Sequence, residues 1–107
     1  MQIKCLSVNP PWARKIIFED KDIENRPWKT KHRGLIAIHE TKNGGGSGCI
    51  IGLANLVDCV DSSDSPYFFG PYGFVLTDKK SIEPIPIKGK LGLFNINIPD
   101  SVLEQIE

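Results

Sequence analysis

The sequence predicts an α+β fold, a small mixed β-barrel of about six strands with two short helices at its ends. Segments with the apolar patterns of strands outnumber the two segments with helical spacing. The stretches between strands are too short for repeated crossover helices, which argues against a parallel doubly wound sheet. With 107 residues the chain has room for one core. We therefore expect residues 1–107 to form a single domain.

The first third of the chain predicts a strand, a helix and a short strand. Residues 2–8 alternate between apolar and polar side chains, the period of a half-buried strand. Residues 10–18 begin with two prolines, which a first helical turn tolerates, and continue with the spacing of an amphipathic helix. This spacing assigns Trp12 to the core. Residues 22–28 predict a short strand that ends at its proline.

The remainder of the chain predicts mainly strands, at residues 34–40, 49–60, 73–78 and 91–98. The segment 49–60 is almost continuously apolar, which indicates burial on both faces or a barrel bend at Gly52. Residues 81–90 contain two prolines and are at best an edge strand. Residues 99–107 place Val102, Leu103 and Ile106 at helical spacing after a capping residue, which predicts a short terminal helix.

The charge pattern excludes a strongly basic protein that binds nucleic acid by net charge alone. The chain has 13 Lys and Arg against 13 Asp and Glu, so its formal net charge is zero. The charges are nevertheless polarised, because basic residues outnumber acidic ones in residues 1–34 and the reverse holds in the remainder. Such a distribution suits a protein with one side that faces an anion.

Several function classes have no support in the sequence. The longest nearly apolar run, residues 49–57, is too short to cross a bilayer, and residues 1–12 lack the pattern of a secretory leader, so we expect a cytoplasmic location. Cys5, Cys49 and Cys59 form no CxxC pair, and with two scattered histidines they offer no metal-ligand spacing. We expect buried reduced thiols, no metal and no cofactor. Residues 43–48 have the composition of a flexible linker, which fits either an engineered shortening of a longer natural loop or a natural glycine turn.

A set of ordered motifs resembles the ASCH domain (activating signal cointegrator homology) of the PUA-like superfamily. The motifs run from the first predicted strand to Phe94, which is most of the chain: LSVNPPW (6–12), KDIENRPW (21–28), RG (33–34), IHETK (38–42), GLANLVDCV (52–60), GPYGFVL (70–76) and IPIKGKLGLF (85–94). The resemblance implies a PUA-like β-barrel. It also implies an RNA-related role, since members of the family are regarded as RNA-binding or RNA-processing domains, some similar to an amidohydrolase of acetylated cytidine and some linked to ribonuclease activity.

The chain departs from the family pattern at positions that concern activity. Pro10 stands where many members have a glutamine. The amidohydrolase branch has the motif Lys-x-x-Thr-x-Arg, of which Lys21 and Arg26 match and Glu24 replaces the threonine. The acidic residue that this branch places on a later helix has no obvious counterpart in residues 61–71. The resemblance therefore transfers the fold more directly than the amidohydrolase activity.

Lys21 and Glu24 are the candidate catalytic residues if the protein is an enzyme. A lysine beside a carboxylate in a partly dry pocket can shuttle a proton or act as a nucleophile or base. In this hypothesis Lys21 activates water or attacks an amide carbonyl, Glu24 exchanges protons, and Arg26 stabilises the oxyanion. The alternative is a set of surface ion pairs worth about 0–1 kcal/mol each.

The candidate ligand-binding residues combine cations, aromatics and hydrogen-bonding groups. Residues 26–33 interleave Trp28 with basic side chains, as in a groove that tracks phosphates and stacks a base, although Trp28 can equally belong to the core. Tyr72 belongs to an aromatic segment whose Phe68, Phe69 and Phe74 we assign to the core. The full set is Ser7, Asn25, Arg26, Trp28, Lys29, Lys31, His39, Lys42 and Tyr72.

Three of these residues have structural alternatives. His39 is a candidate general acid or stacking partner, or a hydrogen-bonded residue of a strand. Lys42 behind it could hold a phosphate. Ser7 either caps the following helix or donates to a ligand, and because no His-Asp relay is evident in the sequence, a serine nucleophile is not expected.

The leading functional hypothesis is binding of RNA or a nucleotide in a cleft that includes Lys21, Glu24, Arg26 and His39. A small hydrolase of a modified nucleoside, or a ribonuclease, that uses Lys21 and Glu24 is the second hypothesis. The third is a protein-interaction module built on the acidic residues between 58 and 64. The sequence does not determine the oligomeric state.

Overall fold

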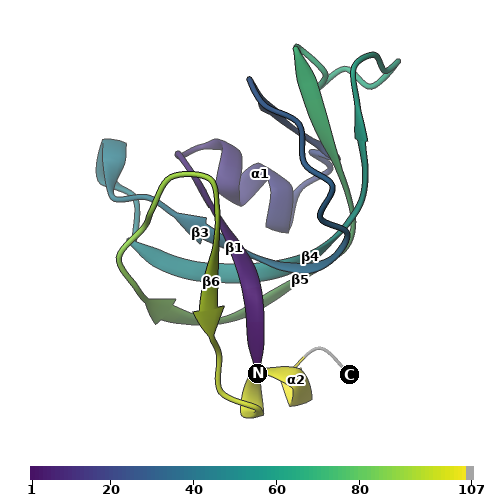
Figure 1. Cartoon of the computed structure of the whole chain (residues 1–107). Helices are drawn as coiled ribbons and strands as arrows, with labels where there is room; N and C mark the ends of the chain where they lie inside the picture. The colour runs from purple at the N-terminus through teal and green to yellow at the C-terminus, as the bar shows by residue number, and fades with distance from the viewer. Residues whose placement is uncertain (106–107) are drawn as a thin grey trace.

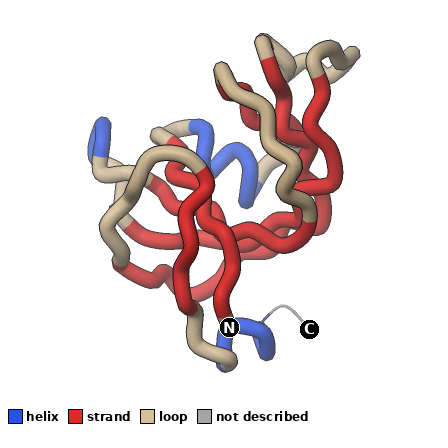
Figure 2. The backbone as a smooth tube through the Cα atoms, in the orientation of Figure 1, coloured by secondary structure: helices blue, strands red, loops and turns tan. Residues whose placement is uncertain are grey.

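One six-stranded mixed sheet forms the body of the protein, seen here in a computed structural model that describes residues 1–105 (Figures 1 and 2). The elements along the chain are β1 (Gln2–Val8), α1 (Trp12–Phe18), β2 (Ile23–Arg26), β3 (Gly34–Glu40), a 3-10 turn (Asn43–Gly45), β4 (Cys49–Val60), β5 (Tyr72–Pro86), β6 (Leu93–Asn97) and α2 (Ser101–Gln105). The terminal helix is present as predicted, although Ile106, one of the residues that predicted it, lies outside the described residues.

The strand order is β2-β5-β4-β3-β1-β6. Among the described residues, the β1–β3 pair is the one parallel pair, and its connection contains α1 and β2, which return the chain to the same end of the sheet. The other neighbours are antiparallel. This confirms the predicted α+β class with a mixed, curved sheet. In the described residues the edge strands β2 and β6 are not paired with each other, so the barrel is not closed.

Apolar side chains on the two faces of the sheet form two core clusters. The first joins α1 to one face, with Ala13, Ile16 and Ile17 of the helix packed on side chains such as Leu6 and Ile36. Figure 1 shows α1 lying against the curved strands. The second cluster, on the opposite face, includes Cys5, Ala37, Ile50, Leu53, Ile82, Ile98 and Val102. Successive residues of β1 and β3 alternate between the clusters, as the period of a strand requires.

The helix does not bury Trp12, contrary to the sequence prediction. Its buried positions are Ala13, Ile16 and Ile17, which lie three and four residues apart. Trp12 precedes this stripe at the first helical position, and the residue is 45% exposed. The predicted apolar spacing is present in the helix. The buried stripe, however, begins at Ala13 and not at Trp12.

Both features expected of segment 49–60 are present. Residues 50–54 of β4 are all buried, so both faces of the strand are covered there. The strand is also irregular at Gly52, where the β4–β5 register shifts. A Cβ atom at Gly52 would lie 2.5 Å from the carbonyl oxygen of Lys80 and 2.6 Å from Cδ1 of Ile17. Glycine therefore allows α1 and β5 to approach β4 from two sides.

The segments 73–78 and 81–90 do not form separate elements, because residues 72–86 form the single strand β5. β2 pairs only with the first four residues of β5, from Tyr72 to Val75. The later part of β5 has β4 as its one neighbour, so it is an edge and tolerates Pro84 and Pro86. The predicted edge character is thus confirmed, whereas the predicted break is wrong.

The aromatic segment 67–74 lies only partly in the core. Phe74 is fully buried, as predicted, while Phe68 is half-buried and Phe69 is 80% exposed. The backbone N–H groups of Phe69 and Gly70 are bound by the side chain of Asn25, so this loop is held while the Phe69 ring remains in solvent. The core assignment of Phe69 is therefore wrong.

The three cysteines are free, and only one is fully buried. Burial raises the pKa of the Cys5 thiol to about 12. Cys49 and Cys59 are partly exposed, so the prediction of buried thiols holds for Cys5 alone. Among the described residues, no helix is long and apolar enough to span a membrane.

Candidate functional site

A groove of about 1140 Å³ runs along one end of the sheet. It lies where β1 and β3 end, beside the connection 41–48 and the loop that leads from β5 to β6; this loop is drawn in tan in Figure 2. Its lining residues are Ser7, Asn9, Arg26, His39, Thr41, Lys42, Asn43, Ser47, Gly48, Cys49, Pro86, Ile87, Lys88, Gly89, Lys90 and Leu91.

The groove is cationic although the chain as a whole carries no net charge. Arg26, Lys42, Lys88 and Lys90 line it, and none of its lining residues is acidic. Apolar surface comes from Pro86, Ile87 and the fully exposed Leu91. This combination can hold the phosphates and the ring faces of a nucleotide chain.

Ser7 and His39 meet on the floor of the groove. They are partners in the register of the parallel β1–β3 pair, and Oγ of Ser7 lies 2.9 Å from Nδ1 of His39. Nε2 of His39 lies 3.2 Å from the carbonyl oxygen of Ile87. A carbonyl can only accept, so Nε2 is the donor in this contact. With the proton on Nε2, the tautomer that carries a single proton leaves Nδ1 to accept from the Ser7 hydroxyl.

The loop after β5 approaches this pair closely at Gly89. A Cβ atom at position 89 would lie 2.7 Å from Oγ of Ser7 and 2.9 Å from Cε1 of His39. Only glycine lets the backbone pass at this distance. The predicted cap is not formed, since α1 has no side-chain cap hydrogen bond and Ser7 bonds His39 instead.

Lys21, Glu24 and Arg26 form a chain of charges behind the groove. Lys21 is 97% buried, and its Nζ donates to the carbonyl oxygen of Ile23 and, at 3.2 Å, to Oε1 of Glu24. Oε2 of Glu24 accepts from Nη2 (2.9 Å) and Nε (3.2 Å) of Arg26. Nη2 also donates to the carbonyl oxygen of Ser7 at 2.7 Å. The three residues thus converge, but only Arg26 lines the groove.

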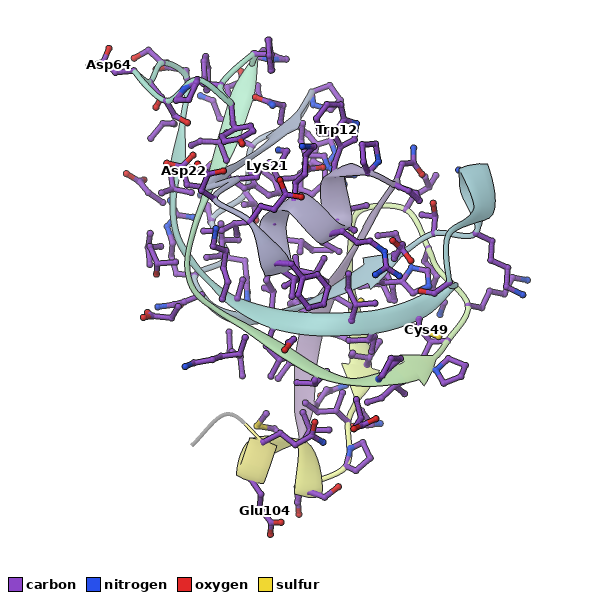
Figure 3. All side chains as sticks on the ribbon, turned by 180° about the vertical axis from the view of Figure 1, so that it is seen from behind. Trp12, Lys21, Asp22, Cys49, Asp64 and Glu104 are labelled. Atoms are coloured by element: carbon purple, nitrogen blue, oxygen red, sulfur yellow. The ribbon has the colours of Figure 1, made fainter. Side chains whose placement is uncertain are left out.

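Two aromatic rings lie against the ammonium group of Lys21. Its Nζ is 5.9 Å from the ring centroid of Trp12 and 5.8 Å from that of Tyr67. Figure 3 shows Lys21 and Trp12 side by side near α1. The Tyr67 hydroxyl donates to Asp20 at 2.8 Å, which lowers the pKa of Asp20 and raises the pKa of Tyr67. These contacts fill the surroundings of Lys21 with protein groups.

The groove wall formed by residues 41–48 is attached to β3 through Glu40. This carboxylate is buried and accepts from the Ser47 backbone N–H (2.8 Å) and from Nε of Arg14 (2.8 Å). Burial raises the pKa of Glu40, but the bonds from Ser47 and Arg14 outweigh this effect and leave the pKa below its usual value. Asn9 adds a second attachment by accepting from Thr41 and Asn43.

A smaller cavity of about 360 Å³ contains two of the other predicted binding residues, Lys29 and Tyr72. Nζ of Lys29 lies 5.3 Å from the centroid of the Tyr72 ring. Cys59, Val60, Asp61 and Ser62 complete the lining. This cavity shares no lining residue with the groove.

The remaining predicted residues lie outside both cavities. Asn25 holds the 67–70 loop, since its side chain donates to the carbonyl oxygen of Tyr67 and accepts from two backbone N–H groups. Trp28 packs against the core with its ring edge-on to Phe74 at 5.0 Å. Lys31 is exposed. Of the predicted set, the groove collects Ser7, Arg26, His39 and Lys42.

Sequence reasoning missed Lys88 and Lys90 as functional candidates. The signal was present in the alternation of IPIKGK, in which basic residues stand two apart just after an edge strand. The structure describes residues 1–105, and within them no group of three or more His, Cys, Asp or Glu side chains is placed to hold a metal ion.

The open mixed sheet with its end groove places the protein in the PUA-like class of folds. In architecture it is similar to the ASCH protein of Zymomonas mobilis. A Ser-to-Ala and a Tyr-to-Phe variant of it each have a TM-score of 0.64 at 19% identity, over 96% of this chain and 92% and 94% of theirs. The unmodified protein has a TM-score of 0.61 over 96% of this chain and 92% of its own.

The chain belongs to the ASCH domain family, whose model matches residues 6–90. It is also similar to activating signal cointegrator 1 of human (26% identical) and mouse (24% identical), in each case over 87% of this chain. It spans only 22% of the length of these two proteins. The family resemblance seen in the sequence motifs is thereby confirmed.

Proposed function

We propose that this ASCH domain binds single-stranded RNA, or a nucleotide within it, in the cationic groove. The observation that carries the proposal is the gathering of Arg26, Lys42, Lys88 and Lys90 around one groove whose lining contains no carboxylate. In a chain with zero net charge, this local concentration of cations supplies the attraction for phosphates.

The groove residues divide the work of binding in this proposal. Lys42, Lys88 and Lys90 hold backbone phosphates, and Arg26 presents a guanidinium whose direction is set by Glu24 and the Ser7 carbonyl. Leu91, Pro86 and Ile87 offer apolar surface to the bases. Since few groups face the base edges, we expect tolerance of base sequence and strong dependence on salt.

Fluorescence anisotropy with a labelled single-stranded RNA of eight nucleotides tests the proposal. The variant K88A/K90A should bind at least about tenfold more weakly at low salt, because two phosphate contacts are lost. In a plot of the logarithm of the affinity against the logarithm of the salt concentration, the slope for K88A/K90A should be smaller in magnitude than that of the parent by about 1.4. Each lost phosphate contact to a single strand contributes about 0.7 to this slope. K80A, which removes an exposed lysine of β5 outside the groove, is the matched control.

Equal binding and equal salt slopes for K88A/K90A and K80A would show that the groove is not the RNA footprint. Binding by the parent that does not change with salt would point away from phosphate contacts altogether. The second result would favour a protein partner for the acidic residues between 58 and 64.

The alternative function is a hydrolase that uses Lys21 and Glu24, and it requires that these groups contact a substrate. Its nucleophile or base would have to reach a substrate, whereas Lys21 is buried, bound to Ile23 and Glu24, and lies between the rings of Trp12 and Tyr67. We therefore expect no cytidine above the K21A background when the protein is incubated with acetylated cytidine and analysed by mass spectrometry. Product that K21A abolishes would establish this alternative instead.

A further inference from the structure

The Ser7–His39 pair has the arrangement of an activated serine. An activated nucleophile needs a base within hydrogen-bond reach and a third group that orients the base. Oγ of Ser7 is 2.9 Å from Nδ1 of His39, and Nε2 of His39 is 3.2 Å from the Ile87 carbonyl oxygen. The backbone carbonyl thus takes the orienting role that a carboxylate has in the Ser-His-Asp triad.

Ser7 is the partly exposed member of the pair, whereas His39 is 97% buried. Both residues line the open groove. Nη2 of Arg26, whose charge is paired with Glu24, donates to the Ser7 carbonyl oxygen at 2.7 Å and so fixes the backbone that carries the hydroxyl. The Gly89 backbone passes over the pair where a Cβ would collide with it.

From this geometry we propose that Ser7 and His39 form a catalytic dyad for acyl transfer, and that its substrates are carboxylic esters of phosphorylated alcohols. The ester carbonyl lies at Oγ of Ser7, and the phosphate is held by the groove cations Lys42, Lys88 and Lys90. The activity shares the groove with the proposed RNA binding but does not require it.

The reaction consists of two balanced steps. First, Oγ of Ser7 bonds to the acyl carbon and its proton passes to Nδ1 of His39, after which the bond to the alcohol oxygen breaks and that oxygen takes the proton. Water then attacks the acyl-serine, giving its proton to His39. The carboxylic acid leaves as the Oγ–C bond breaks, and the proton returns to Oγ.

Covalent labelling with a fluorophosphonate tests the nucleophile directly, because an activated serine forms an Oγ–P bond and releases fluoride. We expect one label per folded parent molecule, located on Ser7 by peptide mass spectrometry. The label should be absent from S7A and retained in S81A, in which an exposed serine of β5 is removed. Labelling of H39Q should be slower by a factor of about 100, the usual contribution of a general base.

Turnover of defined esters tests the substrate class. The parent should hydrolyse ribose-O-acetyl AMP at least about tenfold faster, in kcat/KM, than ribose-O-acetyl adenosine, and K88A/K90A should reduce this preference. K80A should leave both rates unchanged. Circular dichroism melting of S7A and H39Q, compared with the parent, establishes that each variant is folded.

A folded parent that takes no label, or a label that persists in S7A, would overturn the dyad. Equal turnover of the two esters would overturn the substrate class. Neither experiment contains RNA, so these failures are separate from loss of RNA binding in K88A/K90A. RNA binding with no labelling would leave Ser7 and His39 as a structural pair on the floor of a binding groove.

Discussion

Lys21, Glu24 and Arg26 show how a buried ion network can set the position of a side chain in a groove. Each carboxylate oxygen of Glu24 accepts from a different cation, and Arg26 carries the network to the backbone of Ser7. Spacing alone left two possibilities, a catalytic group and a set of surface ion pairs. The structure shows a third arrangement, in which Lys21 and Glu24 are buried and only Arg26 reaches the groove.

The substitution Glu24→Gln should lower the free energy of unfolding by about 3 kcal/mol, because it leaves the Lys21 charge buried without its counter-ion. It should also weaken RNA binding, since Arg26 loses its anchor. Urea unfolding and anisotropy measure the two effects. Glu19→Gln breaks the exposed Lys15–Glu19 pair (3.5 Å) and should cost less than about 0.5 kcal/mol. Equal costs for both variants would contradict the role assigned to Glu24.

At the scale of single elements, β4 depends on the absence of a side chain at Gly52. The strand lies between α1 on one side and the later part of β5 on the other, and both approach the same Cα. The close packing of α1 and β5 on β4 at this position therefore requires glycine.

The substitution Gly52→Ala should destabilise the fold by about 1–3 kcal/mol, because the new methyl group meets the Lys80 backbone and Ile17. Thermal and urea unfolding measure the loss. Gly44→Ala is the comparison, since its Cβ has open space and only its φ of 58° is unfavourable, at about 1 kcal/mol. Adding Ile17→Val to Gly52→Ala should restore part of the loss, and no restoration would locate the conflict entirely in the backbone.

At the scale of the whole molecule, the ionised form of Glu40 holds the groove wall to β3 and contributes to the free energy of unfolding. Its pKa is lower in the folded protein than the value of about 4.3 in an unfolded chain. Folding therefore favours the ionised form. The stabilisation is complete above pH 4.3 and is lost as the pH falls through the lower pKa of the folded state.

The free energy of unfolding of the parent should thus fall as the pH drops below about 4.3, and Glu40→Gln should flatten this part of the curve. At neutral pH the variant should be less stable by about 2 kcal/mol, the worth of hydrogen bonds to a charged group. Urea unfolding at several pH values provides the measurement. Glu83→Gln, which removes an exposed carboxylate, should give a curve parallel to that of the parent. A parallel curve for Glu40→Gln would exclude Glu40 as a source of the acid sensitivity.

Much of the fold could be predicted because it depends on local patterns. The alternation in residues 2–8, the apolar run 49–60 and the Gly52 bend each correspond to a feature of the structure. Two predictions about the elements were wrong. Two segments that were predicted separately join in the single strand β5. The buried stripe of α1 begins one residue after Trp12, which is exposed.

The site was predicted less completely, because a groove is formed by residues distant in the chain. Arg26, Lys42 and Lys88 come from three separate segments, and Ser7 meets His39 only through the β1–β3 register. Lys29 and Tyr72 carry equally suggestive local patterns, yet they line a different cavity.

The sequence by itself determined the strand-rich fold class, the ASCH family and the pool of polar residues from which a site is built. These properties follow from the order of side chains along the chain, which local periodicity records directly. Only the tertiary structure decided which cations share the groove, that Lys21 is buried, and that the Ile87 carbonyl orients His39 toward Ser7. Those facts depend on the register between strands and on the path of loops. Both are set by packing of the whole core, which no local pattern contains.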